Sequence, residues 1–322
     1  MDEAVHCPPT FKLSFTEQVY AVEFSPFEWL QDLICVAFGE EIVVGTVKFQ
    51  DDDDVEDNIT YTPIKTFHHD TRVQSISWSP ETSLSVVPKI VAFCVAGADF
   101  KIRLYHSNLN DVNIYEILEG HKDYINAIAY EAEGELVASV SDDHTCKLWA
   151  IKEDNKSVST FYLTSPGVSV CWHNEESGKL LVAEKNGLIH LYNVRSQQAI
   201  MSLDANIVPL VSADWSPNPL KVACVAAGEL LVWDVSRPSR PILNHTVYVE
   251  GGSVMKFSNG NENLIACIGR PDNALKVVNL KNKQVILSGN VKLIGGLTWH
   301  HKLPYVCAGS DREVFFWRIN SK

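Results

Sequence analysis

The chain contains 322 residues, of which 46% are hydrophobic and 21% are charged, as is usual for a folded soluble protein. The net charge is −13, and the Lys and Arg residues are scattered, which argues against direct nucleic-acid binding through a basic patch. No apolar run approaches the roughly 20 residues that cross a bilayer, and the acidic start of the chain does not resemble a signal peptide. We therefore expect neither membrane insertion nor secretion.

The eight cysteines contain no C-x-x-C pair, so a zinc site of that kind is not indicated. In a chain without a signal peptide they are expected to be reduced thiols. Five of them occupy the same place in a recurring short apolar run, which suits a small side chain buried in a crowded inner strand. These five are Cys35, Cys94, Cys224, Cys267 and Cys307.

An aromatic residue recurs near the end of the first predicted strand of each repeat. The seven positions are Phe24, Trp78, Tyr130, Trp172, Trp215, Phe257 and Trp299. The first two intervals are 54 and 52 residues and the others are 42 or 43, close to the ~40–45 residues of a four-stranded propeller blade. Short apolar runs dominate over helical periodicity, which favours an all-β structure.

A second aromatic residue closes the third predicted strand in five repeats, usually after turn-forming Asp, Asn or Gly residues. The five positions are Tyr105, Trp149, Tyr192, Trp233 and Trp317. Trp233 and Asp234 form the dipeptide that gives WD repeats their name. Repeats one and six lack the second aromatic residue and are degenerate copies.

The repeats predict one all-β domain over residues 1–322, a seven-bladed WD-repeat β-propeller. The expected blades cover residues 20–67, 73–117, 118–163, 165–204, 207–245, 247–288 and 291–319. An open sheet edge after the last repeat would invite aggregation. Residues 11–15 alternate like a strand, so we expect them to supply the outer strand of the seventh blade and close the ring.

The best-formed repeat, residues 118–149, carries a His-Ser-Asp-Trp set that has the spacing of the hydrogen-bonded tetrad of WD repeats. The set consists of His121, Ser139, Asp143 and Trp149. Asp can hold the His ring, His can reach Ser, and Ser can accept the indole N–H, which would satisfy buried polar groups inside one blade. A hydrolase triad uses some of the same residue types, but the placement within one blade favours a structural role.

A run of acidic residues precedes the second repeat. It comprises Asp51, Asp52, Asp53, Asp54, Glu56 and Asp57. We favour a solvated loop, with a docking arm for a basic surface as the alternative. A calcium loop is the weakest option, because the run lacks the ordered spacing and the Gly of such loops.

No other pattern indicates catalysis, a cofactor or a metal. The pairs His68-His69 and His300-His301 are poor metal sites, since neighbouring side chains on a strand point to opposite faces. The chain has neither a phosphate-binding G-x-x-x-x-G-K-[ST] loop nor a G-x-S-x-G nucleophile elbow. We therefore predict a non-enzymatic binding scaffold, and an enzyme with its site at the central channel is the second class considered.

Several stretches resemble the small WD-repeat nucleoporins of the Y-shaped outer-ring scaffold of the nuclear pore. They include residues 66–69, 78–82, 139–146, 165–173, 182–187 and 197–200. The resemblance implies a subunit of a hetero-oligomeric complex that docks on the large arm nucleoporin of the scaffold. It also implies localisation to the nuclear envelope and, in mitosis, to kinetochores. The implied role is to support pore assembly and the transport of protein and mRNA. The run at 165–173 is not shared by WD repeats in general.

Two other binding roles are open to a WD-repeat propeller. A substrate receptor of a cullin-type ubiquitin ligase would carry Trp-Asp-x-Arg, whereas Arg237 here follows Trp233-Asp234 one residue too late. A reader of peptides or histones would need an aromatic or acidic pocket on one face of the ring.

Overall fold

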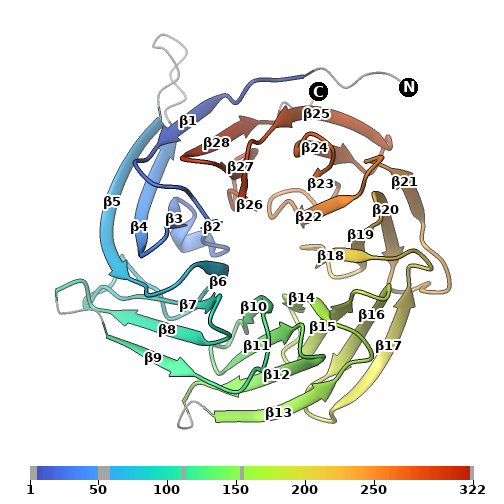
Figure 1. The fold of residues 1–322 in the computed structure, drawn as a ribbon, viewed down its shortest axis with the longest axis horizontal. Helices are drawn as coiled ribbons and strands as arrows, with labels where there is room; N and C mark the ends of the chain where they lie inside the picture. Colours follow the sequence, from blue (N-terminus) through green and yellow to red (C-terminus); the bar gives the residue numbers. More distant parts are fainter. Residues whose placement is uncertain (1–5, 50–58, 111–113, 153–155, 320–322) are drawn as a thin grey trace.

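The computed structural model describes residues 6–49, 59–110, 114–152 and 156–319. These segments form seven four-stranded antiparallel sheets, arranged as blades around a central axis (Figure 1). In each blade the first strand lies beside the axis and the fourth lies at the rim. The prediction of an all-β propeller with seven blades is confirmed. Within the described segments, no helix is both long enough and apolar enough to traverse a bilayer.

The first four blades follow one another along the chain. Blade 1 also contains a short 3-10 helix, η1 (Glu28–Leu30), between its first two strands. Blade 1 contains β2 (Ala21–Phe24), β3 (Leu33–Ala37), β4 (Glu41–Phe49) and β5 (Ile59–His68). Blade 2 contains β6 (Val73–Trp78), β7 (Val91–Gly97), β8 (Ile102–Ser107) and β9 (Ile114–Leu118). Blade 3 contains β10 (Ile125–Tyr130), β11 (Leu136–Ser141), β12 (Thr145–Ala150) and β13 (Lys156–Tyr162). Blade 4 contains β14 (Gly167–Trp172), β15 (Lys179–Glu184), β16 (Leu188–Asn193) and β17 (Gln198–Asp204).

Blades 5 and 6 follow in chain order, and blade 7 combines the last three strands with the first strand, β1. Blade 5 contains β18 (Leu210–Trp215), β19 (Lys221–Ala226), β20 (Glu229–Asp234) and β21 (Leu243–Thr246). Blade 6 contains β22 (Gly252–Phe257), β23 (Leu264–Gly269), β24 (Ala274–Asn279) and β25 (Gln284–Asn290). Blade 7 contains β26 (Ile294–Trp299), β27 (Tyr305–Ser310), β28 (Glu313–Arg318) and β1 (Phe11–Ser14).

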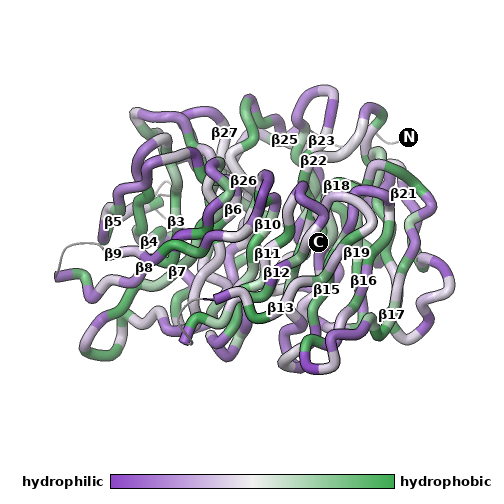
Figure 2. Tube along the Cα trace, turned by 60° about the horizontal axis from the view of Figure 1, so that its bottom comes forward, coloured by the Kyte–Doolittle hydropathy of each residue, from purple (hydrophilic) through white to green (hydrophobic). Residues whose placement is uncertain are grey.

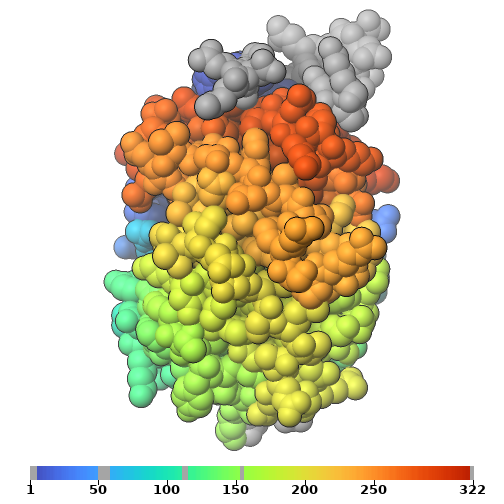
Figure 3. Space-filling view, turned by 90° about the vertical axis from the view of Figure 1, so that its right-hand side faces the viewer, coloured from blue at the N-terminus to red at the C-terminus, as the bar shows by residue number. Residues whose placement is uncertain are grey.

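The hydrophobic core is divided among the interfaces between neighbouring blades. Seven clusters of buried side chains each join residues of two adjacent blades. Figure 2 shows hydrophobic stretches along the strands and hydrophilic stretches along many of the connections at the two faces. Figure 3 views the rim near β17 and β21, where consecutive blades lie against one another. Each blade therefore depends on its neighbours to cover both faces of its sheet.

The aromatic residues that define the repeat occupy equivalent places. All seven of the first set are the last residues of the innermost strands, as their spacing predicts. The five cysteines predicted to lie in the core are fully buried and unpaired. In blade 1, Gly45 lies opposite Ile34, the place that Trp149 occupies opposite Val137 in blade 3. A Cβ atom on Gly45 would come within 2.6 Å of the Tyr61 ring, so Tyr61 of β5 fills the space that an aromatic residue fills elsewhere.

Hydrogen bonds between innermost strands tie each blade to the next. Trp78 Nε1 donates to the carbonyl of Glu23 at 3.2 Å, and Trp172 Nε1 donates to the carbonyl of Ala129 at 2.9 Å. Short polar side chains also accept backbone N–H groups from the following blade. They are Ser77 from Tyr130, Ser169 from Ala213, Asp214 from Phe257 and Thr298 from Phe24. The innermost strands, which are not paired with one another as a sheet, thus have partners across the blade interfaces.

The N-terminal strand closes the ring, as the sequence predicts. β1 pairs antiparallel with β28, with Phe11 opposite Phe316 and Ser14 opposite Glu313. Trp317 Nε1 donates to the carbonyl of Cys7 at 3.2 Å, and Cys7 N donates to the carbonyl of Ser288 in blade 6 at 2.7 Å. The beginning of the chain therefore fastens blade 7 and also reaches the outer strand of blade 6.

Removal of residues 1–19 is expected to lower the melting temperature by about 10 °C or more, because β28 loses its partner strand and the ring loses its closure. Thermal unfolding followed by circular dichroism measures this change. Deletion of residues 2–5 is the matched control, since it leaves the bridge between His6 and Ser288 and all of β1 intact. An unchanged melting curve after the longer deletion would show that closure contributes little to stability.

Candidate functional site

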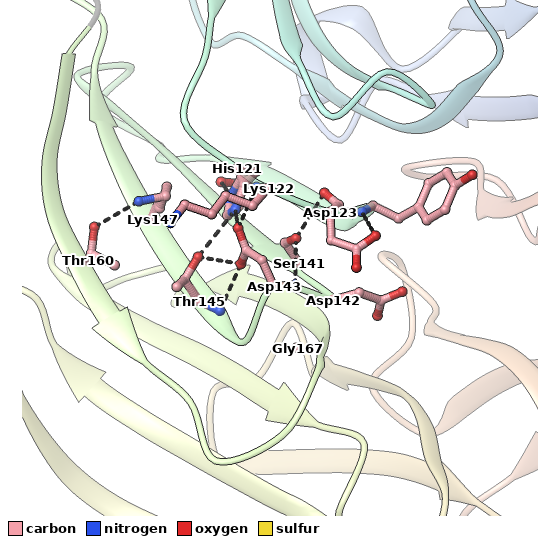
Figure 4. A network of polar contacts seen from close by, with 12 residues as sticks. His121, Lys122, Asp123, Ser141, Asp142, Asp143, Thr145, Lys147, Thr160 and Gly167 are labelled. Carbon is pink, nitrogen blue, oxygen red and sulfur yellow. Dashed lines mark hydrogen bonds and ion pairs between the residues drawn. The ribbon is translucent and has the colours of Figure 1, made fainter.

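The structure brings the four polar and aromatic residues singled out in blade 3 into one connected network. Figure 4 shows the part of this network around Asp143, with His121, Lys122 and Thr145. His121 lies on the connection that enters the blade, Ser139 lies in β11, and Trp149 lies in β12. His121 Nδ1 lies 2.8 Å from Asp143 Oδ2, and His121 Nε2 lies 2.7 Å from Ser139 Oγ. Trp149 Nε1 donates to Ser139 Oγ at 2.9 Å.

The hydrogen bonds of this network fix the positions of its protons. Because the indole of Trp149 donates to Ser139, the hydroxyl proton of Ser139 is free to be donated to Nε2 of His121. The Nδ1–H of His121 then donates to Asp143. Asp143 also accepts the backbone N–H of Lys122 at 2.9 Å and the hydroxyl of Thr145 at 2.6 Å. Each of these donors in the blade 3 network has an acceptor, which suits a buried structural role.

The ionisation of the two central residues fits this arrangement. Burial lowers the pKa of His121 below its ordinary value, and this effect outweighs the opposing hydrogen bond and charge of Asp143. Burial alone would raise the pKa of Asp143, but hydrogen bonds from Thr145, Lys122 and His121 together hold that pKa below its ordinary value. A neutral imidazole beside a carboxylate is therefore the stable pair near neutral pH.

The geometry also bears on catalysis. Ser139 has 0% of its surface exposed, so its hydroxyl is not accessible to a substrate. The hydroxyl is already committed to the imidazole and the indole of the same blade. The network therefore has the residue types of a triad without an open nucleophile.

Blades 2 and 4, which flank blade 3, form polar contacts in the equivalent region with different residues. In blade 2, His69 Nδ1 lies 2.9 Å from the Tyr105 hydroxyl, while Asp99 binds Arg103 at 2.8 Å. In blade 4, Glu184 accepts the Thr164 hydroxyl at 2.7 Å and binds His190 Nε2 at 3.1 Å. These residues are displaced in type and position from the blade 3 pattern, and sequence reasoning missed them.

Three charged side chains lie on the innermost strands of separate blades, near the axis of the ring. They are Glu23 in β2, Asp214 in β18 and Lys256 in β22, and all three are partly buried. Burial raises the pKa of Glu23 to about 7, although Lys256 and a hydrogen bond from Thr298 act in the opposite direction. The charge of Glu23 raises the pKa of Lys256. Burial raises the pKa of Asp214, whose carboxylate accepts the backbone N–H of Phe257 at 2.8 Å.

The remaining candidates from the sequence have separate outcomes. The acidic run formed by Asp51, Asp52, Asp53, Asp54, Glu56 and Asp57 lies outside the described residues. The neighbouring histidines have different partners, because His68 binds Asp70 at 2.9 Å and His69 contacts Tyr105. In the part of the chain that the structure describes, no three His, Cys, Asp or Glu residues are grouped so that they could hold a metal ion.

The fold and the blade 3 network define a WD-repeat propeller. The family model described as "WD domain, G-beta repeat" matches residues 61–106 and 113–150, which lie mainly in blades 2 and 3. A shorter similarity, 22% identity over 172 residues, connects the chain with the target of rapamycin complex subunit LST8 of Bos taurus, covering 52% of this chain and 49% of that protein.

A much longer similarity identifies the family. Nucleoporin Nup37 of Homo sapiens is 42% identical over 308 residues, which cover 94% of each chain. Nucleoporin Nup37 of Drosophila melanogaster is 34% identical over 321 residues, which cover 98% of each chain. The chain belongs to the Nup37 family of nucleoporins.

The substitution Asp143→Ala is expected to lower the free energy of unfolding by about 1–3 kcal/mol, because the N–H groups of His121 and Lys122 lose their acceptor in a buried network. Denaturant unfolding measures this change. Asp272→Ala is the control, since Asp272 is an exposed aspartate in the corresponding turn of blade 6 and should shift stability by less than ~0.5 kcal/mol. A stable Asp143→Ala protein that loses a binding partner would contradict the structural role.

The raised pKa of Glu23 predicts a dependence of stability on pH. An unfolded Glu titrates near ~4.3, whereas the pKa of Glu23 in the folded protein is about 7. Between these values only the folded protein holds the proton, so the contribution of Glu23 to the free energy of unfolding falls as pH rises and stays low above pH ~7. Glu23→Gln abolishes this titration.

Relative to the parent protein, the Glu23→Gln variant should therefore gain on the order of 1–3 kcal/mol between pH 5 and pH 8. Urea unfolding at several pH values measures the difference. Glu40→Gln, which changes an exposed glutamate, should follow the parent at every pH. A constant difference between parent and Glu23→Gln would show that Glu23 is ionised in both states across this range.

Proposed function

We propose that the chain is a non-enzymatic scaffold subunit of the outer ring of the nuclear pore, where it docks on the large arm nucleoporin of the Y-shaped complex. The observation that carries this proposal is the similarity to Nup37 nucleoporins along nearly the whole chain. Through the pore the protein supports pore assembly and the transport of protein and mRNA, and it accompanies the same scaffold to kinetochores in mitosis. It acts at the nuclear envelope as part of a hetero-oligomeric complex.

The structure supports a scaffold in physical terms. The polar network of blade 3 connects buried groups within one blade, and its serine is inaccessible. Hydrogen bonds and packed side chains join successive blades, which favours a rigid ring with two faces and a rim for docking. A rigid surface loses little conformational entropy when a partner binds, so more of the contact energy appears as affinity.

Affinity purification of the tagged chain from cells that express it in place of the untagged copy tests this proposal. The other subunits of the outer-ring complex should co-purify in near-stoichiometric amounts, and fluorescence of the tagged chain should mark the nuclear rim. Cullin adaptors or histones as the main partners, or the absence of any stable partner, would contradict the proposal.

A further inference from the structure

Exposed apolar side chains lie on two joined connections at one face of the ring, in blades 1 and 2. Trp29 in η1 has 59% of its surface exposed, and Val86 and Val87 have 64% and 85% exposed on the connection between β6 and β7. Phe27 stacks on Trp29 with ring centroids 4.9 Å apart and an interplanar angle of 13°. We call these four residues the Trp29 patch. Clustered large apolar side chains at a surface mark interaction sites, whereas single ones are ordinary.

The Trp29 patch is held in place before any partner binds. The indole Nε1 of Trp29 donates to the carbonyl of Thr82 at 3.3 Å, which joins the two connections. Ser83 and Ile90 exchange backbone hydrogen bonds at 2.8 and 2.7 Å and close the base of the segment that carries the valines. Val86 is four residues from Thr82, so it lies within ~14 Å of this junction. Fixed aromatic anchors of this kind dominate the binding energy of protein interfaces.

The Trp29 patch continues into an acidic stretch of the same face. In a four-stranded meander, all connections between first and second strands lie on one face of the ring. A Cβ atom on Gly134 in blade 3 would lie 2.9 Å from the Pro80 side chain in blade 2, so these two connections touch. Glu131 of blade 3 then accepts the backbone N–H of Gly178 in blade 4 at 3.3 Å. The connections of blades 1 to 4 therefore form one continuous surface.

This surface has a strong charge imbalance. The four connections, residues 25–32, 79–90, 131–135 and 173–178, contain eight carboxylates and one lysine, Lys89. The equivalent connections of blades 5 to 7 contain one carboxylate, Glu262, and one lysine, Lys302. An apolar anchor beside an acidic surface is complementary to an apolar segment flanked by Lys and Arg.

We infer that the Trp29 patch and the acidic connections of blades 2 to 4 form the docking surface for the scaffold partner, and that the partner contributes an apolar segment flanked by basic side chains. This inference rests on the proposed function and adds the face of the ring that docks and the chemistry that it recognises. Large side chains of the partner cover Trp29 and Val87, and its Lys or Arg residues face the glutamates of blades 3 and 4.

The test uses the outer-ring nucleoporin complex extracted from cells that lack this chain, and it measures retention of that complex by the immobilised full-length protein. Val87→Asp should weaken binding at least about tenfold, because a carboxylate would be buried against apolar groups. Val249→Asp is the matched control on the opposite face, where Val249 is 91% exposed between β21 and β22. The control should bind within about twofold of the parent.

A second pair of variants tests the charge. Glu133→Lys with Glu135→Lys should weaken retention at least about threefold at low salt, and the difference should shrink as added salt screens the charges. Glu40→Lys with Glu250→Lys changes the net charge equally on the opposite face and should bind like the parent. Melting curves of all variants establish that each is folded.

The outcomes separate the two proposals. If the parent protein retains no outer-ring nucleoporins, the proposed function and this inference both fail. If the parent retains them and Val87→Asp binds as well as Val249→Asp, the function stands and the docking surface is wrong. Selective loss in Val249→Asp would instead assign docking to the opposite face and overturn the inference.

Discussion

The structure depends on the contacts between the innermost strands of adjacent blades. An aromatic residue ends each of these strands, and the indoles of Trp78 and Trp172 donate to a carbonyl of the preceding blade. Serine and threonine side chains accept backbone N–H groups from the following blade. Each strand near the axis is an edge of its own sheet, so without these bonds its polar groups would be buried and unsatisfied. The bonds thus allow seven separate sheets to pack as one ring.

This constraint explains why the fold could be predicted from the sequence. A residue that recurs at the end of each first strand, at intervals of 42 to 54 residues, reveals both the number of blades and their phase. The alternation of residues 11–15 indicates a strand that the last blade needs, and β1 pairs with β28. Chemistry within one blade could also be anticipated, because His121, Ser139, Asp143 and Trp149 lie in one short window and bond to one another.

Contacts that do not follow the repeat pattern could not be predicted in this way. Glu23 and Lys256 influence each other's pKa across the centre of the ring although they are far apart in sequence. The ring of Tyr61 occupies the space above Gly45 because β4 has a glycine at the position that Trp149 holds in blade 3. In blade 4 the carboxylate of Glu184 accepts several hydrogen bonds at once, as the carboxylate of Asp143 does in blade 3. In each case the partner is set by the fold rather than by local spacing.

The same division between repeated and irregular features bears on binding. Residues that repeat around the ring are mostly buried between blades, so they pack the ring together and are not accessible to a partner. The parts of one face differ because the connections between strands differ in length and charge. The connection of residues 79–90 carries two exposed valines and accepts the indole N–H of Trp29 at Thr82, whereas residues 216–220 of blade 5 contain no charged residue. Specific recognition needs such asymmetry, because a ring with seven equal blades would offer a partner seven equivalent positions.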